Sequence, residues 1–134
     1  MPKKPNTDGK LIMVINDTVE ILELFEEILV GEGYRVSLHS YHPSDLQDVK
    51  KVMPELIISD HSVNHEDAGW QFIQKIKMSA DVAYIPIILC TTNLQLVRNN
   101  EGHFGVKGIR VLAKPFNIDD LIIVVKEAFE KGGE

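Results

Sequence analysis

Six polar residues stand directly after short apolar runs of the sequence, and their types suit the handling of a phosphoryl group. They are Asn16, Asp17, Asp60, Thr91, Thr92 and Lys114. Two carboxylates held close together repel by up to ~4 kcal/mol at an effective dielectric constant of about 20, so the pair favours a bridging cation. Because no cysteine or second histidine is paired with these oxygens at a useful spacing, the set favours Mg²⁺ over zinc. A lysine and a hydroxyl beside the metal would complete a site for phosphoryl transfer.

The apolar runs that precede these residues are typical of buried strands, and amphipathic stretches separate them. Strands are predicted at 11–15, 34–38, 56–58, 85–90 and 109–113. Helices are predicted at 19–30, 43–52, after Gly69, weakly around 94–100, and from about 117. Continuous apolar strands need two covered faces, and right-handed crossovers place helices on both. We therefore predict a doubly wound α/β fold with a five-stranded parallel sheet and five helices, whose functional groups gather at the carboxyl ends of the strands.

Two of the predicted helices carry a clear apolar stripe at helical spacing. The first stripe comprises Ile21, Leu24, Phe25, Ile28 and Leu29. The stripe of the last helix comprises Ile118, Leu121, Ile122, Val125 and Phe129. We expect both stripes to face the sheet.

Composition narrows the class of protein. A chain of 134 residues with 44% apolar residues fits one globular domain. The formal net charge of -6 argues against a nucleic acid or an anionic membrane as the main partner. The single cysteine, Cys90, lies in an apolar run that predicts a buried thiol. With no apolar leader and no apolar run of membrane-spanning length, we expect a cytoplasmic protein.

Four motifs occur in the same order as in a known family. They are the acidic turn after the first strand, Asp60 in Leu56-Ile57-Ile58-Ser59-Asp60, Thr91 at the end of Pro86-Ile87-Ile88-Leu89-Cys90-Thr91, and Lys114-Pro115-Phe116. Together they resemble the receiver domains of bacterial two-component response regulators, from about residue 10 to residue 131. The resemblance implies the flavodoxin-like strand order 2-1-3-4-5 and a cis peptide bond between Lys114 and Pro115.

The resemblance also implies a role for each site residue. Asp60 would be the phosphoacceptor, a carboxylate nucleophile that forms an acyl phosphate. Asp17, Asp60 and the backbone carbonyl of Ser62 would bind Mg²⁺, and Asn16 would reach the ion through a water molecule. Thr91 would bond a phosphoryl oxygen, and Lys114 would pair with the phosphate.

Four positions depart from the family pattern. Asn16 stands where most members have a second acid, which removes one negative charge and predicts weaker Mg²⁺ binding. Val111 replaces the usual Tyr or Phe of the family's switch, and Thr92 replaces a small Ala. The loop after Asp60 is one residue longer than is common, with Asn64 where a proline is usual.

We therefore expect a flexible tail at 1–9, a receiver domain at 10–131 and no output domain. The expected function is phosphoryl acceptance on Asp60 from a histidine kinase or a histidine phosphotransfer protein. Output would pass by contact with a downstream protein, without direct contact to nucleic acid or membrane, from a monomer or weak dimer. No enzymatic activity is expected beyond Mg²⁺-dependent self-phosphorylation and dephosphorylation.

Other interpretations of the same residues remain open. The chain could be a pseudo-receiver, a protein-binding module that keeps the fold without switching, which Asn16 and Val111 favour. Asn16 and Asp17 could simply cap the following helix, since Asn and Asp are preferred caps. An enzyme that passes through an aspartyl phosphate is disfavoured, because Ser62 occupies the place where such enzymes need a second acid.

Overall fold

The sheet has five parallel strands in the order β2-β1-β3-β4-β5. The computed structural model describes residues 9–40, 46–60, 68–92 and 108–131. The strands are β1 (Leu11–Ile15), β2 (Arg35–His39), β3 (Leu56–Asp60), β4 (Ile87–Thr91) and β5 (Ile109–Ala113). The described helices are α1 (Val19–Gly31), α2 (Gln47–Val52), α3 (Ala68–Lys77) and α5 (Ile118–Lys131). The predicted fold class and strand order are confirmed, while the predicted helix around 94–100 lies outside the described residues.

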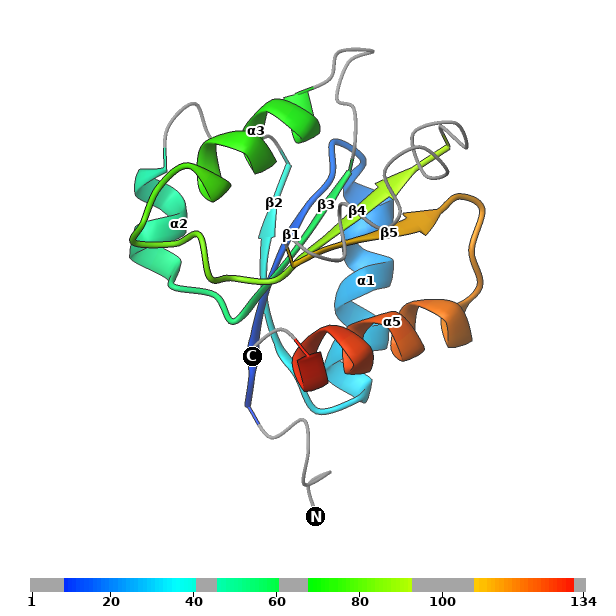
Figure 1. Cartoon of the computed structure of the whole chain (residues 1–134). Helices are drawn as coiled ribbons and strands as arrows, with labels where there is room; N and C mark the ends of the chain where they lie inside the picture. Colours follow the sequence, from blue (N-terminus) through cyan, green and yellow to red (C-terminus); the bar gives the residue numbers. More distant parts are fainter. Residues whose placement is uncertain (1–8, 41–45, 61–67, 93–107, 132–134) are drawn as a thin grey trace.

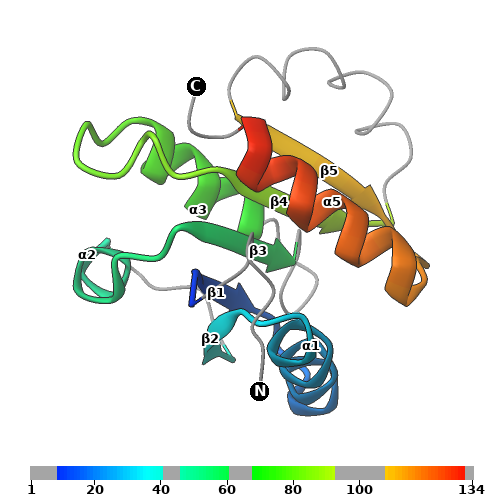
Figure 2. The same ribbon diagram turned by 90° about the horizontal axis from the view of Figure 1, so that it is seen from below.

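Helices cover both faces of the sheet (Figures 1 and 2). Helices α1 and α5 pack on one face, and α2 and α3 pack on the other. Successive strand residues alternate between the two sides, so that Ile12 and Val14 meet the first pair of helices and Met13 and Ile15 the second. This division explains why the central strands are apolar throughout, as predicted for a sheet buried on both faces.

The bounds of β1 and β5 are those predicted, and the bounds of β2, β3 and β4 differ from the predicted ones by one or two residues. β4 begins at Ile87 instead of Ile85, because the Ile85 N–H bonds the Val82 carbonyl in a turn and Pro86 has no N–H to donate. β3 runs on through Ser59 to Asp60, so the predicted phosphoacceptor is the last residue of its strand.

The buried face of α1 was predicted only in part. Leu22, Phe25 and Leu29 are buried against the sheet, whereas Ile21 is 37% and Leu24 is 48% exposed. The residues that meet the sheet follow an i, i+3, i+7 row beginning at Leu22, so the helix is rotated away from the predicted stripe. In α5, Leu121 and Val125 are buried as predicted but Ile118 is 53% exposed, because it lies in the first turn of the helix.

Two turns have distinctive backbone conformations, one between α1 and β2 and one between β5 and α5. Gly33, with φ of 97°, follows the C-cap residue of α1, and its N–H bonds the Val30 carbonyl. The peptide bond between Lys114 and Pro115 is cis, which confirms the prediction. Among the described residues, no helix combines the length and apolar character needed to cross a membrane.

Candidate functional site

The carboxyl ends of β1, β3 and β4 and the turn after β5 border one pocket of about 530 Å³. Its polar end contains Asn16, Asp17, Asp60, Thr92 and Lys114. These residues are far apart in the sequence and meet because parallel strands end at the same edge of the sheet. Five of the six polar residues singled out from the sequence therefore line a common pocket.

An ion pair between Asp60 and Lys114 forms the centre of the site. The Lys114 Nζ donates to Asp60 Oδ1 over 2.6 Å. The Asp60 side chain is 8% exposed and the Lys114 side chain is 34% exposed. The Lys114 backbone N–H also bonds the Thr91 carbonyl over 2.8 Å, which fixes the start of the turn after β5. The carboxylate is thus largely buried, with its charge balanced by one ammonium group.

The two polar residues that follow β1, Asn16 and Asp17, are used differently. The Asn16 side chain is used locally, because its Oδ1 accepts the Thr18 backbone N–H over 2.9 Å at the start of α1. The Asp17 side chain is exposed on the pocket wall, and the Thr18 hydroxyl donates to its Oδ1 over 3.4 Å. Asn16 therefore closes a turn just before α1 and does not cap the helix, whose N-cap is Thr18 without a side-chain cap hydrogen bond, while the Asp17 carboxylate stays available to a ligand.

The structure places the two threonines differently. Thr91 is 1% exposed at the end of β4, and it is the neighbouring Thr92, exposed, that lines the pocket. The predicted bond from the Thr91 hydroxyl to a phosphoryl oxygen stays a prediction. Ser62 and Asn64 lie outside the described residues.

Cys90 lies beside Asp60 in the sheet and is buried. Burial raises the pKa of the Cys90 thiol to about 12, with the Asp60 carboxylate adding to the rise and Lys114 opposing it. The thiol is therefore neutral at physiological pH, as the predicted burial implies.

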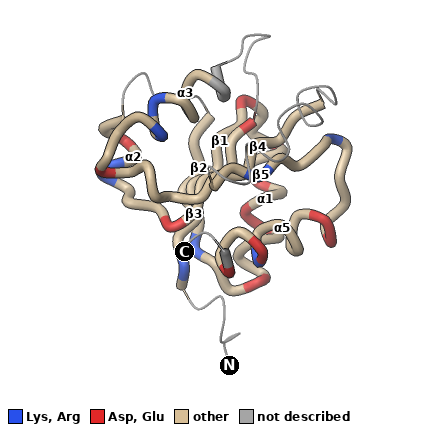
Figure 3. Tube along the Cα trace, in the orientation of Figure 1, with Lys and Arg blue, Asp and Glu red and all other residues tan. Residues whose placement is uncertain are grey.

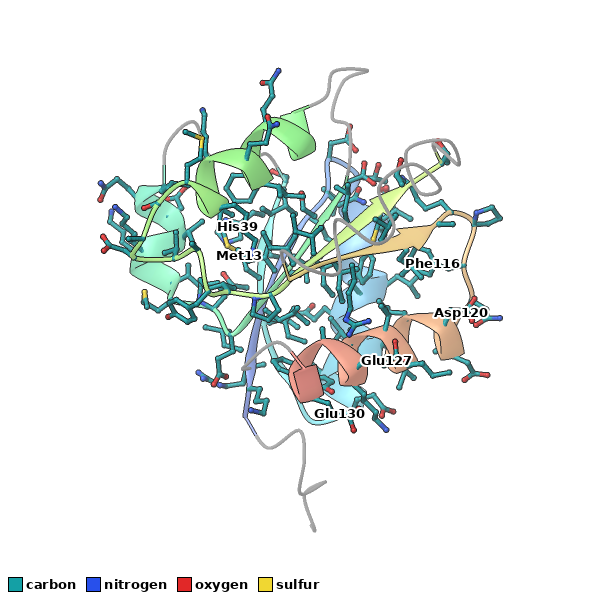
Figure 4. The ribbon with its side chains drawn as sticks, viewed as in Figure 1. Met13, His39, Phe116, Asp120, Glu127 and Glu130 are labelled. Carbon is teal, nitrogen blue, oxygen red and sulfur yellow. The ribbon has the colours of Figure 1, made fainter. Side chains whose placement is uncertain are left out.

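An apolar wall completes the pocket and was not anticipated. It consists of Ile21, Leu24, Phe25 and Ile28 from α1 with Pro115, Phe116 and Leu121. Phe116 packs against Phe25 with ring centroids 6.1 Å apart, and Figure 4 shows it in the turn that leads from β5 to α5. The sequence signal that could have predicted this wall is the apolar content of the first helix, which has more apolar residues than one buried stripe needs.

A metal site here would depend on few ligands. No group of three or more His, Cys, Asp or Glu side chains within the described part of the chain is arranged to hold a metal ion. The two carboxylates that line the pocket, Asp17 and Asp60, supply hard oxygen donors of the kind that Mg²⁺ binds with few protein ligands. The residues present therefore fit Mg²⁺ better than a metal that needs a full protein cage.

Comparison with known proteins agrees with this geometry. Residues 12–126 match the model of the response regulator receiver domain. The chain belongs to this family. It is 29% identical over 120 residues to “Probable transcriptional regulator ycf29” of Porphyra purpurea, covering 87% of this chain and 54% of that protein. The receiver chain thus spans about half the length of the curated relatives it matches.

Solved structures share the fold of this receiver domain. The chemotaxis protein CheY4 of Vibrio cholerae is 21% identical with a TM-score of 0.74, over 90% of this chain and 98% of that one. The receiver domain of the sensor histidine kinase PA1611 from Pseudomonas aeruginosa is 22% identical with a TM-score of 0.70, over 92% and 99% of the two chains. That structure contains a magnesium ion in its active-site cleft.

Proposed function

We propose that this receiver domain accepts a phosphoryl group on Asp60. The donor is a phosphohistidine of a histidine kinase or a histidine phosphotransfer protein, and output passes through contact with a downstream protein. The observation that supports this most is the Asp60 carboxylate, which lines an accessible pocket at a strand end and is paired with Lys114 over 2.6 Å. A carboxylate that is largely buried but faces a pocket is positioned as a nucleophile.

In the proposed transfer, a carboxylate oxygen of Asp60 attacks phosphorus. A phosphorus–oxygen bond forms, the phosphorus–nitrogen bond of the donor breaks, and the histidine nitrogen leaves with the bonding electrons. The Lys114 ammonium lies where it can balance charge on the arriving phosphoryl group, since it already contacts the acceptor carboxylate. Thr91 is proposed to bond a phosphoryl oxygen.

Mg²⁺ is the proposed cofactor. Asp17 and Asp60 would hold it together with the Ser62 backbone carbonyl, and Asn16 would contact it through water. When bound, the ion would neutralise negative charge between the carboxylates and the phosphoryl oxygens. Because residue 16 is an asparagine, and its Oδ1 already accepts the Thr18 N–H, the turn offers one acid fewer than a fully acidic turn would.

A pseudo-receiver is the second candidate. The engagement of Asn16 with the start of α1 favours it, because a turn with a single free carboxylate binds a divalent cation less strongly. In either case we propose a cytoplasmic protein, a monomer or weak dimer, without catalytic turnover of an external substrate.

The test is incubation with Mg²⁺ and phosphoramidate, followed by intact mass measurement. We expect the wild-type chain to gain the mass of one phosphoryl group and Asp60→Asn to gain none. Asp81→Asn, a surface acid that is not in the pocket lining, is the matched control and should behave like wild type. No gain in the wild-type chain, or a gain that persists in Asp60→Asn, would overturn phosphoryl acceptance and leave the pseudo-receiver.

A further inference from the structure

A second pocket, of about 220 Å³, lies at the edge of the sheet where the strands begin, opposite the edge that carries Asp60. We name it the basal pocket. Its apolar lining consists of Met53 and Pro54 just before β3, Tyr84 and Pro86 shortly before β4, and Phe129 near the end of α5. The start of β1 and the end of α5 come together here (Figure 1), and the Lys10 Nζ lies 5.2 Å from the centre of the Phe129 ring.

Two features of Met53 and its neighbour Tyr84 indicate that the basal pocket binds something. The two residues are 48% and 62% exposed, and no described element covers them. Met53 also has φ of 50° and ψ of 58°, a left-handed conformation that is unfavourable for a residue with a side chain and again unfavourable before Pro54. Backbone strain of this kind concentrates at binding sites. The fold thus holds an adaptable thioether side chain at the rim of an apolar pocket.

The lining has the composition of a surface that binds proline-containing segments. Such segments form an extended left-handed helix with three residues per turn, so prolines three positions apart lie on the same side. They dock on grooves lined by aromatic rings, which Tyr84 and Phe129 supply here. The pocket is smaller than the roughly 300–1,000 Å³ of most cofactor sites, which favours ring-sized groups of a peptide as its ligand.

The chain itself has one segment of this kind, and it begins next to the pocket. Residues 2–5 have the sequence Pro-Lys-Lys-Pro, and they lie outside the described residues. The described chain starts at Gly9, whose φ of 73° turns the backbone and whose N–H bonds the Gly33 carbonyl. The next residue, Lys10, lines the pocket. Because Pro5 is five residues from Lys10, at most about 18 Å of chain separates them.

Charge and tethering both favour this segment as the occupant. Lys3 and Lys4 carry positive charge, and Figure 3 shows basic and acidic positions where β1 and β3 begin. Of the two charged residues that line the pocket, Lys10 is placed over the Phe129 ring, and Glu55 has an exposed carboxylate that would face the two lysines. A short tether gives an effective concentration in the millimolar range, which exceeds that of the same segment on a second copy in dilute solution.

We propose that residues 2–5 bind in the basal pocket of their own chain as an extended proline-containing segment. Pro2 and Pro5 would contact Met53, Tyr84 and Phe129, and the bound segment would link the start of β1 to α5 and to the turns before β3 and β4. A filled pocket would be closed to a similar segment of another protein, so residues 2–5 would act as an internal competitor. The proposal does not depend on phosphoryl acceptance, because the two pockets share no lining residue.

NMR of the full chain, labelled with ¹³C at the methionine methyl groups, tests the proposal. The chain has four methionines, at positions 1, 13, 53 and 78. The Met53 signal reports on the basal pocket. Met13 is buried in the core and Met78 is 87% exposed, so their signals are internal controls for folding and for solvent conditions. Met13→Leu, Met53→Leu and Met78→Leu assign the signals.

Matched variants remove either the segment or its binding surface. Pro2→Ala combined with Pro5→Ala should shift the Met53 signal and leave the Met13 and Met78 signals in place. Thr7→Ala, which changes a nearby residue outside 2–5, is the control and should leave all three signals unchanged. In a Tyr84→Ser background the two proline substitutions should shift the Met53 signal much less, because the surface they contact is reduced.

A synthetic peptide of residues 1–8 supplies the segment from outside. It should return the Met53 signal of the double proline variant to its wild-type position. It should also bind that variant about threefold more tightly than it binds wild type, since the tethered segment no longer competes.

Four results would overturn the proposal. They are an unshifted Met53 signal in the double proline variant, an equal shift in Thr7→Ala, equal peptide binding by wild type and the double proline variant, and a wild-type Met53 signal that moves on dilution. The last result would mean that the segment of a second copy fills the pocket. Asp60→Asn should keep the wild-type Met53 signal whatever the outcome of the phosphorylation test, so the two proposals fail separately.

Discussion

Lys114 reaches across the end of β4 to donate a 2.6 Å hydrogen bond from its Nζ to Oδ1 of Asp60. The two residues are 54 positions apart in the sequence and follow or end strands that are not neighbours in the sheet. Their contact therefore requires that β3, β4 and β5 are assembled in this order. It also means that the fold of this turn supplies the Asp60 carboxylate with a counter-charge.

This ion pair predicts a measurable coupling between its two residues. Lys114→Met should lower the free energy of unfolding by about 1–2 kcal/mol in Mg²⁺-free buffer, because it leaves the Asp60 carboxylate without its partner. This loss of unfolding free energy is smaller than for a fully buried ion pair, because the Lys114 side chain is 34% exposed and solvent screens its charge. In an Asp60→Asn background the same change should cost less than about 0.5 kcal/mol. Urea unfolding of the four chains tests this, and additive effects would contradict the coupling.

The rotation of α1 predicts a contrast between two leucines. Leu29 is fully buried and Leu24 is 48% exposed, although both belong to the stripe predicted from the sequence. Leu29→Ala should lower the free energy of unfolding by about 2–4 kcal/mol, because it opens a cavity in the core. Leu24→Ala should cost less than about 1 kcal/mol, as is usual for surface changes. If urea unfolding showed the same loss of unfolding free energy for both variants, the assignment of the buried face of α1 would be wrong.

The sequence predicted the assembly of the site better than its details. The sequence alone predicts that Asp60 and Lys114 lie close together. Apolar strands that end in polar residues imply a parallel sheet, and the carboxyl ends of parallel strands meet at one edge of that sheet. The rotation of α1 could not be predicted, because Ile21, Leu22 and Leu24 offer two adjacent apolar stripes to the sheet. Periodicity alone does not choose between them, whereas packing against β1 and β2 does.

The role of Asn16 shows a second limit. Asn is both a preferred helix cap and an acceptable metal ligand, so its type and position support either role. Only the bond from the Thr18 N–H to the Asn16 Oδ1 decides that the side chain is used at the start of α1. Short polar side chains bond whichever partner the local backbone presents, and this depends on turn geometry that residue spacing does not specify.

The charge missing at Asn16 predicts a gain of metal affinity in a variant. Asn16→Asp keeps an oxygen acceptor for the Thr18 N–H and adds a third carboxylate near Asp17 and Asp60. We expect the affinity for Mg²⁺ to rise about tenfold, which corresponds to about 1.4 kcal/mol. Without Mg²⁺ the variant should be less stable than wild type, because the added carboxylate repels the others.

Titration calorimetry with MgCl₂ measures the affinity, and thermal unfolding with and without the ion measures the stability. Asn117→Asp is the matched control, because it adds the same charge at an exposed asparagine whose Oδ1 also accepts a backbone N–H near the start of a helix, that of Asp120. This control should leave the Mg²⁺ affinity unchanged. An unchanged affinity in Asn16→Asp would instead show that the pocket is not the metal site.

The buried thiol of Cys90 gives the last prediction, which concerns pH. Because burial raises the pKa of Cys90 to about 12 from a usual value of 9.0, its thiolate population at pH 8 is about a thousandfold lower than that of a free thiol. Iodoacetamide at pH 8 should therefore leave the folded chain unlabelled and label it once in concentrated urea, as intact mass will show. Since the unfolded thiol ionises first, its burial stabilises the fold fully below pH 9 and progressively less above it. Stability measured against Cys90→Ala should accordingly fall from pH 9 upward, whereas rapid labelling of the folded chain would mean that the end of β4 opens to solvent.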